Sequence, residues 1–324
     1  MIKTEHLLQT LQTEFDKHSY GENPAELYEP IEYIMALGGK RFRPLLTLLA
    51  ASIYTDNLTD AIKPAMAVEV FHNFTLMHDD IMDRAPLRRG KPTVHEKWNA
   101  NTAILSGDVM LIKAYDLLLD VPAEKLRKVL ARFNQTAAEV CEGQQLDMNF
   151  ETRTDVMEEE YIGMIRLKTS VLLGFALELG GIIGGGNEED VQLLYSAGEH
   201  MGIGFQLKDD LLDVFGDPSK FGKQVGGDII ANKKTFLLIE ALSKAEGYVK
   251  AELEKWIGPG EFDNEAKINA VRNIYETLGI RAFTEQKINE YFTKGLSDLE
   301  ALKAEKLRKE PLLTFARQLV ERDK

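Results

Sequence analysis

Two clusters of aspartates carry the clearest chemical signal in the sequence. Asp79–Asp83 reads Asp-Asp-Ile-Met-Asp, and Asp209–Asp213 repeats the spacing as Asp-Asp-Leu-Leu-Asp. In a helix, residues four apart such as Asp79 and Asp83 share one face, where their like charges repel. A divalent cation would relieve this repulsion. Mg2+ suits such hard oxygen ligands, because it takes one or two protein carboxylates together with substrate phosphates.

One cluster alone is equally compatible with a solvated acidic helix end, because short motifs give many false positives. The repetition favours metal binding, since helical proteins build metal sites from carboxylates on facing helices. A basic segment also follows each cluster: the first contains Arg88 and Arg89, and the second contains Lys223 and Lys233. Mg2+ would bridge carboxylate to phosphate while Arg and Lys bind the other phosphate oxygens. The pattern therefore predicts a substrate that carries phosphates.

A third basic segment, Gly38–Pro44, reads Gly-Gly-Lys-Arg-Phe-Arg-Pro. The glycines are suited to end one helix, and the proline is suited to the first turn of the next. Lys40 and Arg43 therefore lie near a helix N-terminus, where backbone N–H groups favour anions. An ordinary basic loop is the alternative. His72 lies two helical turns before Asp79 on nearly the same face, and we expect it either to join the site or to be structural.

Composition limits the possible partners. The net charge of −13 over 324 residues argues against nucleic acids, which need a basic face, and against anionic membranes. The only cysteine, Cys141, is expected to be a small buried side chain, and a reducing compartment fits. The N-terminus shows no signal-peptide core. Val171–Gly186 is apolar but interrupted by glycines and Glu178, so we expect no transmembrane segment and a cytoplasmic protein.

Helical periodicity runs through almost every segment, and no convincing strand pattern appears. We therefore predict an all-α fold and one domain spanning residues 1–324. Lys168 lies among apolar turns, so we expect it to have an anionic partner. The expected helices cover residues 3–18, 25–37, 44–54, 63–82, 93–120 with a break near 99–101, 123–150, 156–180, 187–213 and most of 234–320.

Taken together, these segments resemble the trans-isoprenyl diphosphate synthases, also called polyprenyl synthetases, over nearly the whole chain. The segments that carry the resemblance are Gly38–Pro44, Asp79–Asp83, Leu87–Pro92, Lys168-Thr169, Gly204–Asp213, Gly222-Lys223 and Asp228–Thr235. The resemblance implies a single large helical bundle around a deep central cavity, usually as a homodimer. It also implies condensation of isopentenyl diphosphate with an allylic diphosphate (dimethylallyl, geranyl or farnesyl), with release of pyrophosphate.

Roles for individual residues follow from the resemblance. Asp79, Asp83 and Asp209 would bind three Mg2+ ions, supported by Asp80, Asp210 and Asp213. The residues implied to bind the allylic diphosphate are Arg88, Lys168, Lys223 and Lys233. Those implied to bind isopentenyl diphosphate are Lys40, Arg43, His72 and Arg89. Thr169 and Gln206 would lie near the reacting carbons. The predicted catalytic set is Asp79, Asp80, Asp83, Asp209, Lys168, Thr169 and Gln206.

Product length depends on residues before Asp79, because the growing chain is expected to run along that helix. Each isoprene unit is comparable to one helical turn, about 5.4 Å. Phe74 lies five positions upstream, with Thr75 and Phe71 beside it. We expect the ring of Phe74 to act as the floor, the residue that closes the end of the cavity for the growing chain. The expected product is then C20, with C15 as the second choice. The alternative is that Phe71 and Phe74 are core residues and another residue forms the floor.

Other functions remain open at this point. A terpene cyclase ionises the same substrates but needs one diphosphate site, whereas two basic sites and two complete clusters favour a condensing enzyme. A non-catalytic partner subunit of the same fold usually loses an aspartate cluster, and both are present here. A ferritin-like di-metal protein would need Glu-x-x-His pairs, and no matched pair accompanies the clusters.

Overall fold

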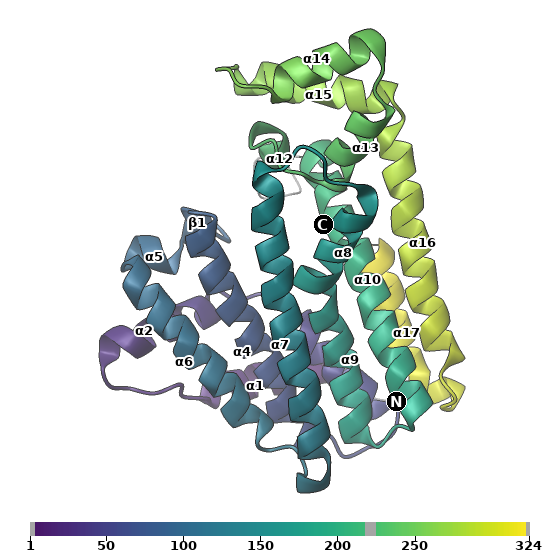
Figure 1. Cartoon of the computed structure of the whole chain (residues 1–324). Helices are drawn as coiled ribbons and strands as arrows, with labels where there is room; N and C mark the ends of the chain where they lie inside the picture. The colour runs from purple at the N-terminus through teal and green to yellow at the C-terminus, as the bar shows by residue number, and fades with distance from the viewer. Residues whose placement is uncertain (1–3, 218–224, 322–324) are drawn as a thin grey trace. The chain divides into compact units, whose positions relative to one another are not determined.

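The structure is a computed structural model that describes residues 4–217 and 225–321, and its regular structure is overwhelmingly helical (Figure 1). The prediction of an all-α fold is confirmed. The helices are α1 Thr4–Lys17, α2 Ala25–Ala36, α3 Phe42–Ser52, α4 Thr59–Met82, α5 Val94–Lys97, α6 Ala100–Leu118, α7 Ala123–Thr152, α8 Glu158–Ile165, α9 Val171–Gly184, α10 Glu188–Phe215, α12 Gly227–Ile230, α13 Phe236–Lys244, α14 Gly247–Ile257, α15 Asn264–Thr277, α16 Ile280–Ala301 and α17 Lys306–Glu321. A π-helical turn, η1 Arg166–Ser170, joins α8 to α9.

The chain forms two compact units, and each is described by itself. The first unit takes its described residues from Met1–Ala137, Leu172–Gly198 and Asp298–Ala316. The second takes its described residues from Ala138–Val171, Glu199–Ser297 and Arg317–Lys324. Both units thus contain segments distant in sequence. A single domain over residues 1–324 stays a prediction.

Helix α4 is the central helix of the first unit. It packs against α6 and α3, and also contacts α1, α2 and α5. Its buried residues fall on every side of the helix between Ala61 and Asp80, which is the pattern of a helix enclosed by neighbours. The first aspartate cluster lies at its C-terminal end. Packing on all sides therefore fixes the helix that carries these carboxylates.

Helices α3 and α9 of the first unit approach each other through glycine. A Cβ atom on Gly180 would lie 2.2 Å from the carbonyl oxygen of Thr47, and one on Gly184 would lie 2.6 Å from that of Ala51. The sequence predicted that Gly180-Gly181 and Gly184–Gly186 end this helix, and the structure places the end at Gly184 and not at Gly180. That glycine serves close packing in mid-helix, and α9 continues to Gly184, before a residue of positive φ.

The second unit contains the π turn, and glycines of two neighbouring helices lie directly against its backbone. A Cβ atom on Gly143 would lie 2.2 Å from the backbone nitrogen of Lys168, and one on Gly202 would lie 2.6 Å from the Cα of Ser170. Helices α7 and α10 can therefore approach the turn closely on these two positions. Elsewhere in this unit, α13 packs on α8 and α15, and α15 also contacts α12 and α14.

The continuous helix Glu158–Gly184 is long and apolar enough to cross a membrane by length and composition. The sequence argument had judged this region too interrupted for a span. In the structure, 78% of its most apolar window is buried inside the protein. Such burial is typical of a core helix, and glycines such as Gly180 and Gly184 are where this helix contacts α3.

Candidate active site

The first aspartate cluster presents its three carboxylates to different surroundings. Asp79 is partly exposed, and Asp83 caps the end of α4 in solvent. Asp80 is buried, and its carboxylate accepts two hydrogen bonds of 2.7 Å each, from Nε and Nη2 of Arg88. This bidentate geometry is the strongest arrangement available to an Arg–carboxylate pair. Asp79 and Asp83 are the more exposed carboxylates of this cluster, and their binding of a cation stays a prediction.

The basic segment after α4 forms a small hairpin, which the sequence pattern had not shown. Strands β1 Leu87–Arg88 and β2 Lys91–Pro92 pair antiparallel, so Arg89 and Gly90 form the two-residue turn. Their φ angles are 53° and 74°, and two positive φ angles are typical of the type I′ turn that such hairpins prefer. The hairpin places Arg88 against Asp80 at the end of α4, and Arg89 follows it as the first residue of the turn.

The hairpin meets the first basic loop at Gly39. Nη2 of Arg89 lies 2.9 Å from where a Cβ of Gly39 would be. Gly39 therefore leaves space for the guanidinium. Arg41, with a φ of 47°, directly precedes α3 as its N-cap residue. The segments that contain Lys40 and Arg89, distant in sequence, thus come together in the first unit, and a common anion site there stays a prediction.

His72 joins this basic cluster as a neutral group. Nη1 of Arg43 lies 3.1 Å from Nε2 of His72. A guanidinium can only donate, so Nε2 accepts and the ring proton is on Nδ1. Burial, followed by the charges of Arg43, Arg89 and Arg88, lowers the pKa of His72 well below its usual 6.5. The ring can therefore offer an anion a neutral N–H donor.

The second cluster repeats the pattern in the second unit. Asp209 is exposed, whereas Asp210 is buried. The hydroxyl of Tyr161 donates to Asp210, and Nε2 of Gln206 donates to its Oδ1 at 3.1 Å. The hydroxyl of Thr169 in turn donates to Oε1 of Gln206 at 3.1 Å. Burial is the main cause that raises the pKa of Asp210 to about 7. This network holds Thr169 and Gln206, two predicted site residues, in fixed orientation.

Lys168 was predicted to have an anionic partner because it lies among apolar residues, and that partner is Asp147. Its Nζ lies 2.6 Å from Oδ2 of Asp147, and about a fifth of each side chain is exposed. Sequence reasoning had not assigned Asp147 or Tyr161 to the site. Asp147 follows Gly143 on α7 by one turn, so the glycine contact with η1 brings its carboxylate to Lys168. The requirement for an anion near Lys168 was the signal that could have pointed to Asp147.

The third carboxylate of the second cluster organises the following loop. Oδ2 of Asp213 accepts the backbone N–H of Asp228 at 2.9 Å. Lys233 lies near enough to help lower the pKa of Asp210, against the larger effect of burial. The prediction for Lys223 lies outside the described residues.

The two clusters lie in different units, so a common metal site stays a prediction. Within residues 4–217 and 225–321, no group of three or more His, Cys, Asp and Glu side chains is arranged to hold a metal ion. The donor set nevertheless fits Mg2+, because carboxylates such as Asp83 and Asp209 are accessible hard oxygen donors. Mg2+ ordinarily completes its coordination with phosphates and water.

The predicted floor residues belong to an aromatic cluster in the first unit. Phe71 is 1% exposed and packs edge-on against Phe133, with ring centroids 5.1 Å apart. Phe74 is 9% exposed and contacts both Phe71 and His78. The hydroxyl of Thr75 donates to the carbonyl of His72. Phe71 is thus fully a core residue, whereas Phe74 lies at the edge of the cluster.

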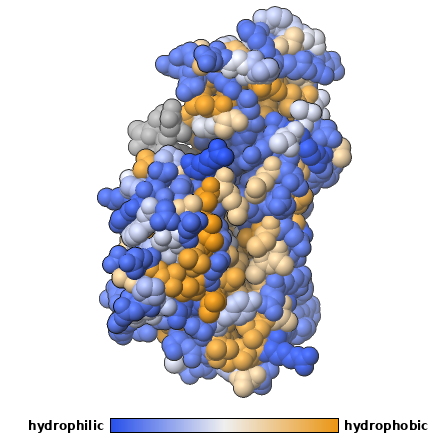
Figure 2. Space-filling model, turned by 60° about the vertical axis from the view of Figure 1, so that its left-hand side comes forward, coloured by the Kyte–Doolittle hydropathy of each residue, from blue (hydrophilic) through white to orange (hydrophobic). Residues whose placement is uncertain are grey.

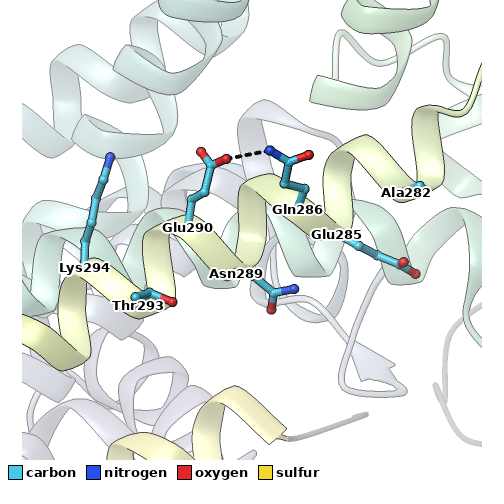
Figure 3. A pocket seen from close by; sticks show the side chains of 7 residues that line it. All are labelled: Ala282, Glu285, Gln286, Asn289, Glu290, Thr293 and Lys294. Carbon is cyan, nitrogen blue, oxygen red and sulfur yellow. Dashed lines mark hydrogen bonds between the residues drawn. The ribbon is translucent and has the colours of Figure 1, made fainter.

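Two other features fall outside the site. Cys141 is exposed, so the expectation that it is buried was wrong: its position on α7 faces outward. A hollow of about 670 Å3 lies along α16 between Ala282 and Lys294 (Figure 3). Its lining residues all come from one helix, along which Nε2 of Gln286 donates to Oε1 of Glu290. It contains none of the predicted site residues.

Comparisons with known proteins identify the family of the chain. The family model described as polyprenyl synthetase matches residues 24–276. A geranylgeranyl diphosphate synthase of Methanosarcina mazei is 41% identical, over 86% of this chain and 85% of its own. A geranylfarnesyl diphosphate synthase of Natronomonas pharaonis is 35% identical, over 93% of this chain and 91% of its own. A crystal structure of a geranylgeranyl pyrophosphate synthase is 46% identical and matches with a TM-score of 0.94 over 99% of each chain. The chain belongs to the polyprenyl synthetase family.

Proposed function

We propose that the protein condenses isopentenyl diphosphate with an allylic diphosphate and releases pyrophosphate, in a reaction that requires Mg2+. The observation that carries this proposal is the cluster of Arg43, His72 and Arg89, which forms in the same unit as the helix that ends in Asp79 and Asp83. A condensing enzyme needs one site for each of two diphosphates. A cyclase needs only one, and the relatives named above are synthases.

The chemistry divides between these groups. Bound Mg2+ would stabilise the negative charge that develops on the leaving pyrophosphate. Asp79, Asp83 and Asp209 would hold three such ions, and Lys168 and Lys233 would bind remaining diphosphate oxygens. Arg43, Arg89 and neutral His72 would orient isopentenyl diphosphate, so that its double bond lies close to the allylic carbon that becomes cationic. The apolar helix faces would exclude water, which would otherwise quench the cation.

A C20 product is the finer part of the proposal. Phe74 is buried at the edge of the aromatic cluster, at 9% exposed, while Phe71 is enclosed at 1%. The relatives support a product in this range, because their names include geranylgeranyl and geranylfarnesyl diphosphate synthases. We therefore assign the floor to Phe74, next to the smaller Thr75.

A homodimer and a cytoplasmic location complete the proposal. Leu105, Ile112 and Leu119 are 58–60% exposed and recur every seven residues at the surface of α6 and its end. This spacing presents an apolar stripe suited to another helix. The face of the protein that carries α6 shows apolar areas within a largely hydrophilic surface (Figure 2). Ile112→Glu should convert the dimer to a monomer in sedimentation experiments, and an unchanged mass would contradict this assignment.

The decisive assay incubates the purified full chain with labelled isopentenyl diphosphate, Mg2+ and separate C5, C10 and C15 allylic diphosphates. Products are dephosphorylated and sized by chromatography and mass spectrometry. A linear series ending at C20 is expected. No incorporation of isopentenyl diphosphate with any primer would overturn the reaction and favour a cyclase or a non-catalytic subunit.

Phe74→Ala tests the product length separately. The variant should extend the series beyond C20, because removal of the ring opens space for at least one more unit. Phe315→Ala is the matched control: Phe315 is similarly buried, at 8% exposed, but it packs on Phe42 away from the α4 aromatic cluster. An unchanged product from Phe74→Ala would show that the floor lies elsewhere.

A further inference from the structure

The π-helical turn η1 sets the directions of two consecutive site residues in the second unit. Such turns are rare, and they often lie at functional sites. Within η1, the side chain of Lys168 bonds to Asp147 on α7, whereas that of its neighbour Thr169 bonds to Gln206 on α10. Lys168, Thr169 and Gln206 were all predicted for the site. Asp147 is the partner in this arrangement to which no role has been given.

Asp147 and Lys168 form a direct ion pair. Oδ2 of Asp147 lies 2.6 Å from Nζ of Lys168, and their side chains are 17% and 21% exposed, respectively. A hydrogen bond between charged groups is stronger than one between neutral groups. Because the pair is mostly buried, water and salt screen it less than they screen an exposed pair. The ammonium group is therefore held at a defined place on α7.

The backbone of Lys168 lies against the same helix as its ammonium group. Gly143 precedes Asp147 by one turn of α7, and a Cβ atom on Gly143 would lie 2.2 Å from the backbone nitrogen of Lys168 and 2.6 Å from its Cα. The lysine side chain thus contacts α7 at both of its ends. A lysine loses much rotamer freedom when it is held in one position, and these two contacts restrict this one.

We propose that Asp147 is a positioning residue that holds the ammonium group of Lys168 where it binds the diphosphate of the allylic substrate. This inference rests on the proposed function. An ammonium group carries three N–H donors, so a bond to one carboxylate oxygen is compatible with a second bond to a diphosphate oxygen. The rotamer freedom of Lys168 is then lost during folding and not during binding, which favours binding.

The direction of the effect of Asp147→Asn distinguishes positioning from simple charge. A carboxylate near the site repels an anionic substrate. If Asp147 only reduced the positive charge around Lys168, the variant would therefore bind the allylic diphosphate more tightly. If Asp147 positions Lys168, the variant binds it more weakly, because the ammonium group is no longer held in place. Asparagine keeps the size of the side chain and removes its charge.

The test measures steady-state KM for geranyl diphosphate and for isopentenyl diphosphate in wild type, Asp147→Asn and Asp147→Glu. Asp147→Asn should raise KM for geranyl diphosphate by about tenfold to a hundredfold, the range expected for losing an interaction with a charged group. KM for isopentenyl diphosphate should change less than about twofold. Asp147→Glu retains the charge and should give an intermediate value, which decides the question if Asp147→Asn does not fold.

Glu199→Gln is the matched control. Oε1 of Glu199 lies 2.6 Å from Nη1 of Arg166, which belongs to the same π turn, and 21% of the Glu199 side chain is exposed. The control thus removes an equally short ion pair from the other side of the turn, on α10. A selective rise in KM for geranyl diphosphate in the Asp147 variants alone is expected. An unchanged or lower KM, or an equal rise for both substrates or in Glu199→Gln, would overturn the proposal.

Calorimetric binding of geranyl diphosphate to the full chain, with Mg2+ and without isopentenyl diphosphate, separates this proposal from the reaction itself. If the wild type binds this compound but forms no product in the complete assay, the proposed reaction fails, and weaker binding by Asp147→Asn still supports positioning. If the wild type forms product and both Asp147 variants bind like wild type, positioning fails and the reaction stands. If the wild type neither binds nor reacts, both proposals fall.

Discussion

Arg88→Ala would leave the carboxylate of Asp80 buried without its partner. The side chain of Asp80 is 3% exposed and that of Arg88 is 22% exposed. Removal of one member of a buried pair costs about 3–5 kcal/mol, because the remaining charge has neither water nor a counter-ion. Since Arg88 is partly exposed, water can enter the space it leaves, and we expect the lower value, about 3 kcal/mol.

The unfolding temperature should report this loss. An unfolding entropy of about 2.1 cal/mol/K per residue gives roughly 0.7 kcal/mol/K for the 324-residue chain. A loss of about 3 kcal/mol therefore corresponds to a Tm lowered by about 4 °C. The assay is thermal and urea unfolding followed by circular dichroism, without Mg2+ or substrate, so that ligand binding does not contribute.

A second substitution identifies the cause. Adding Asp80→Asn to Arg88→Ala removes the stranded charge and should restore at least half of the lost free energy of unfolding. Lys17→Ala is the control, since Lys17 and Glu14 form an exposed ion pair worth at most about 0.5 kcal/mol. A cost below about 1 kcal/mol for Arg88→Ala, or no recovery in the double variant, would refute the argument from burial.

Three further predictions concern the site. Asp79→Ala and Asp209→Ala should each lower turnover by orders of magnitude without loss of helical circular dichroism; lost helix content would instead show that the clusters are structural. Gly143→Ala should cost about 1–3 kcal/mol in urea unfolding, because its Cβ would meet the backbone of Lys168, whereas Gly163→Ala, with nothing within 4 Å, should cost nothing. The ring of His72 should stay neutral at pH 6.5 by NMR, because its pKa is lowered. Since the unfolded chain takes up a proton near pH 6.5 and folded His72 does not, this residue should reduce stability as the pH falls below 6.5; a ring that titrates near 6.5 would contradict both statements.

The features that could be predicted from the sequence are those set by local spacing. The helices, the aspartate clusters and the loop between Gly38 and Pro44 depend on neighbours within a few turns. The need of Lys168 for an anion was also predictable, because it follows from apolar residues on the same helix. For the aspartate clusters and the basic loop, residue type and spacing along the chain are enough to predict the chemistry.

The features that could not be predicted depend on distant partners. The pairing of Arg88 with Asp80 depends on a turn with two positive φ angles, which folds the hairpin back over α4, and the prediction that Arg88 binds substrate stays a prediction. Tyr161 reaches Asp210 across 49 positions of sequence. Gly180 looked like a helix end because its role in packing is visible only beside Thr47.

The glycine contacts between α3 and α9 have a consequence for how the family can diversify. Where two helices touch through their backbones, the distance between them does not depend on the size of nearby side chains. Residues such as Phe74 can then be exchanged for smaller or larger ones without moving that part of the framework. A lineage could therefore change the length of its product by one or two substitutions while the fold tolerates them, and Gly180 and Gly184 would be the positions that selection keeps fixed.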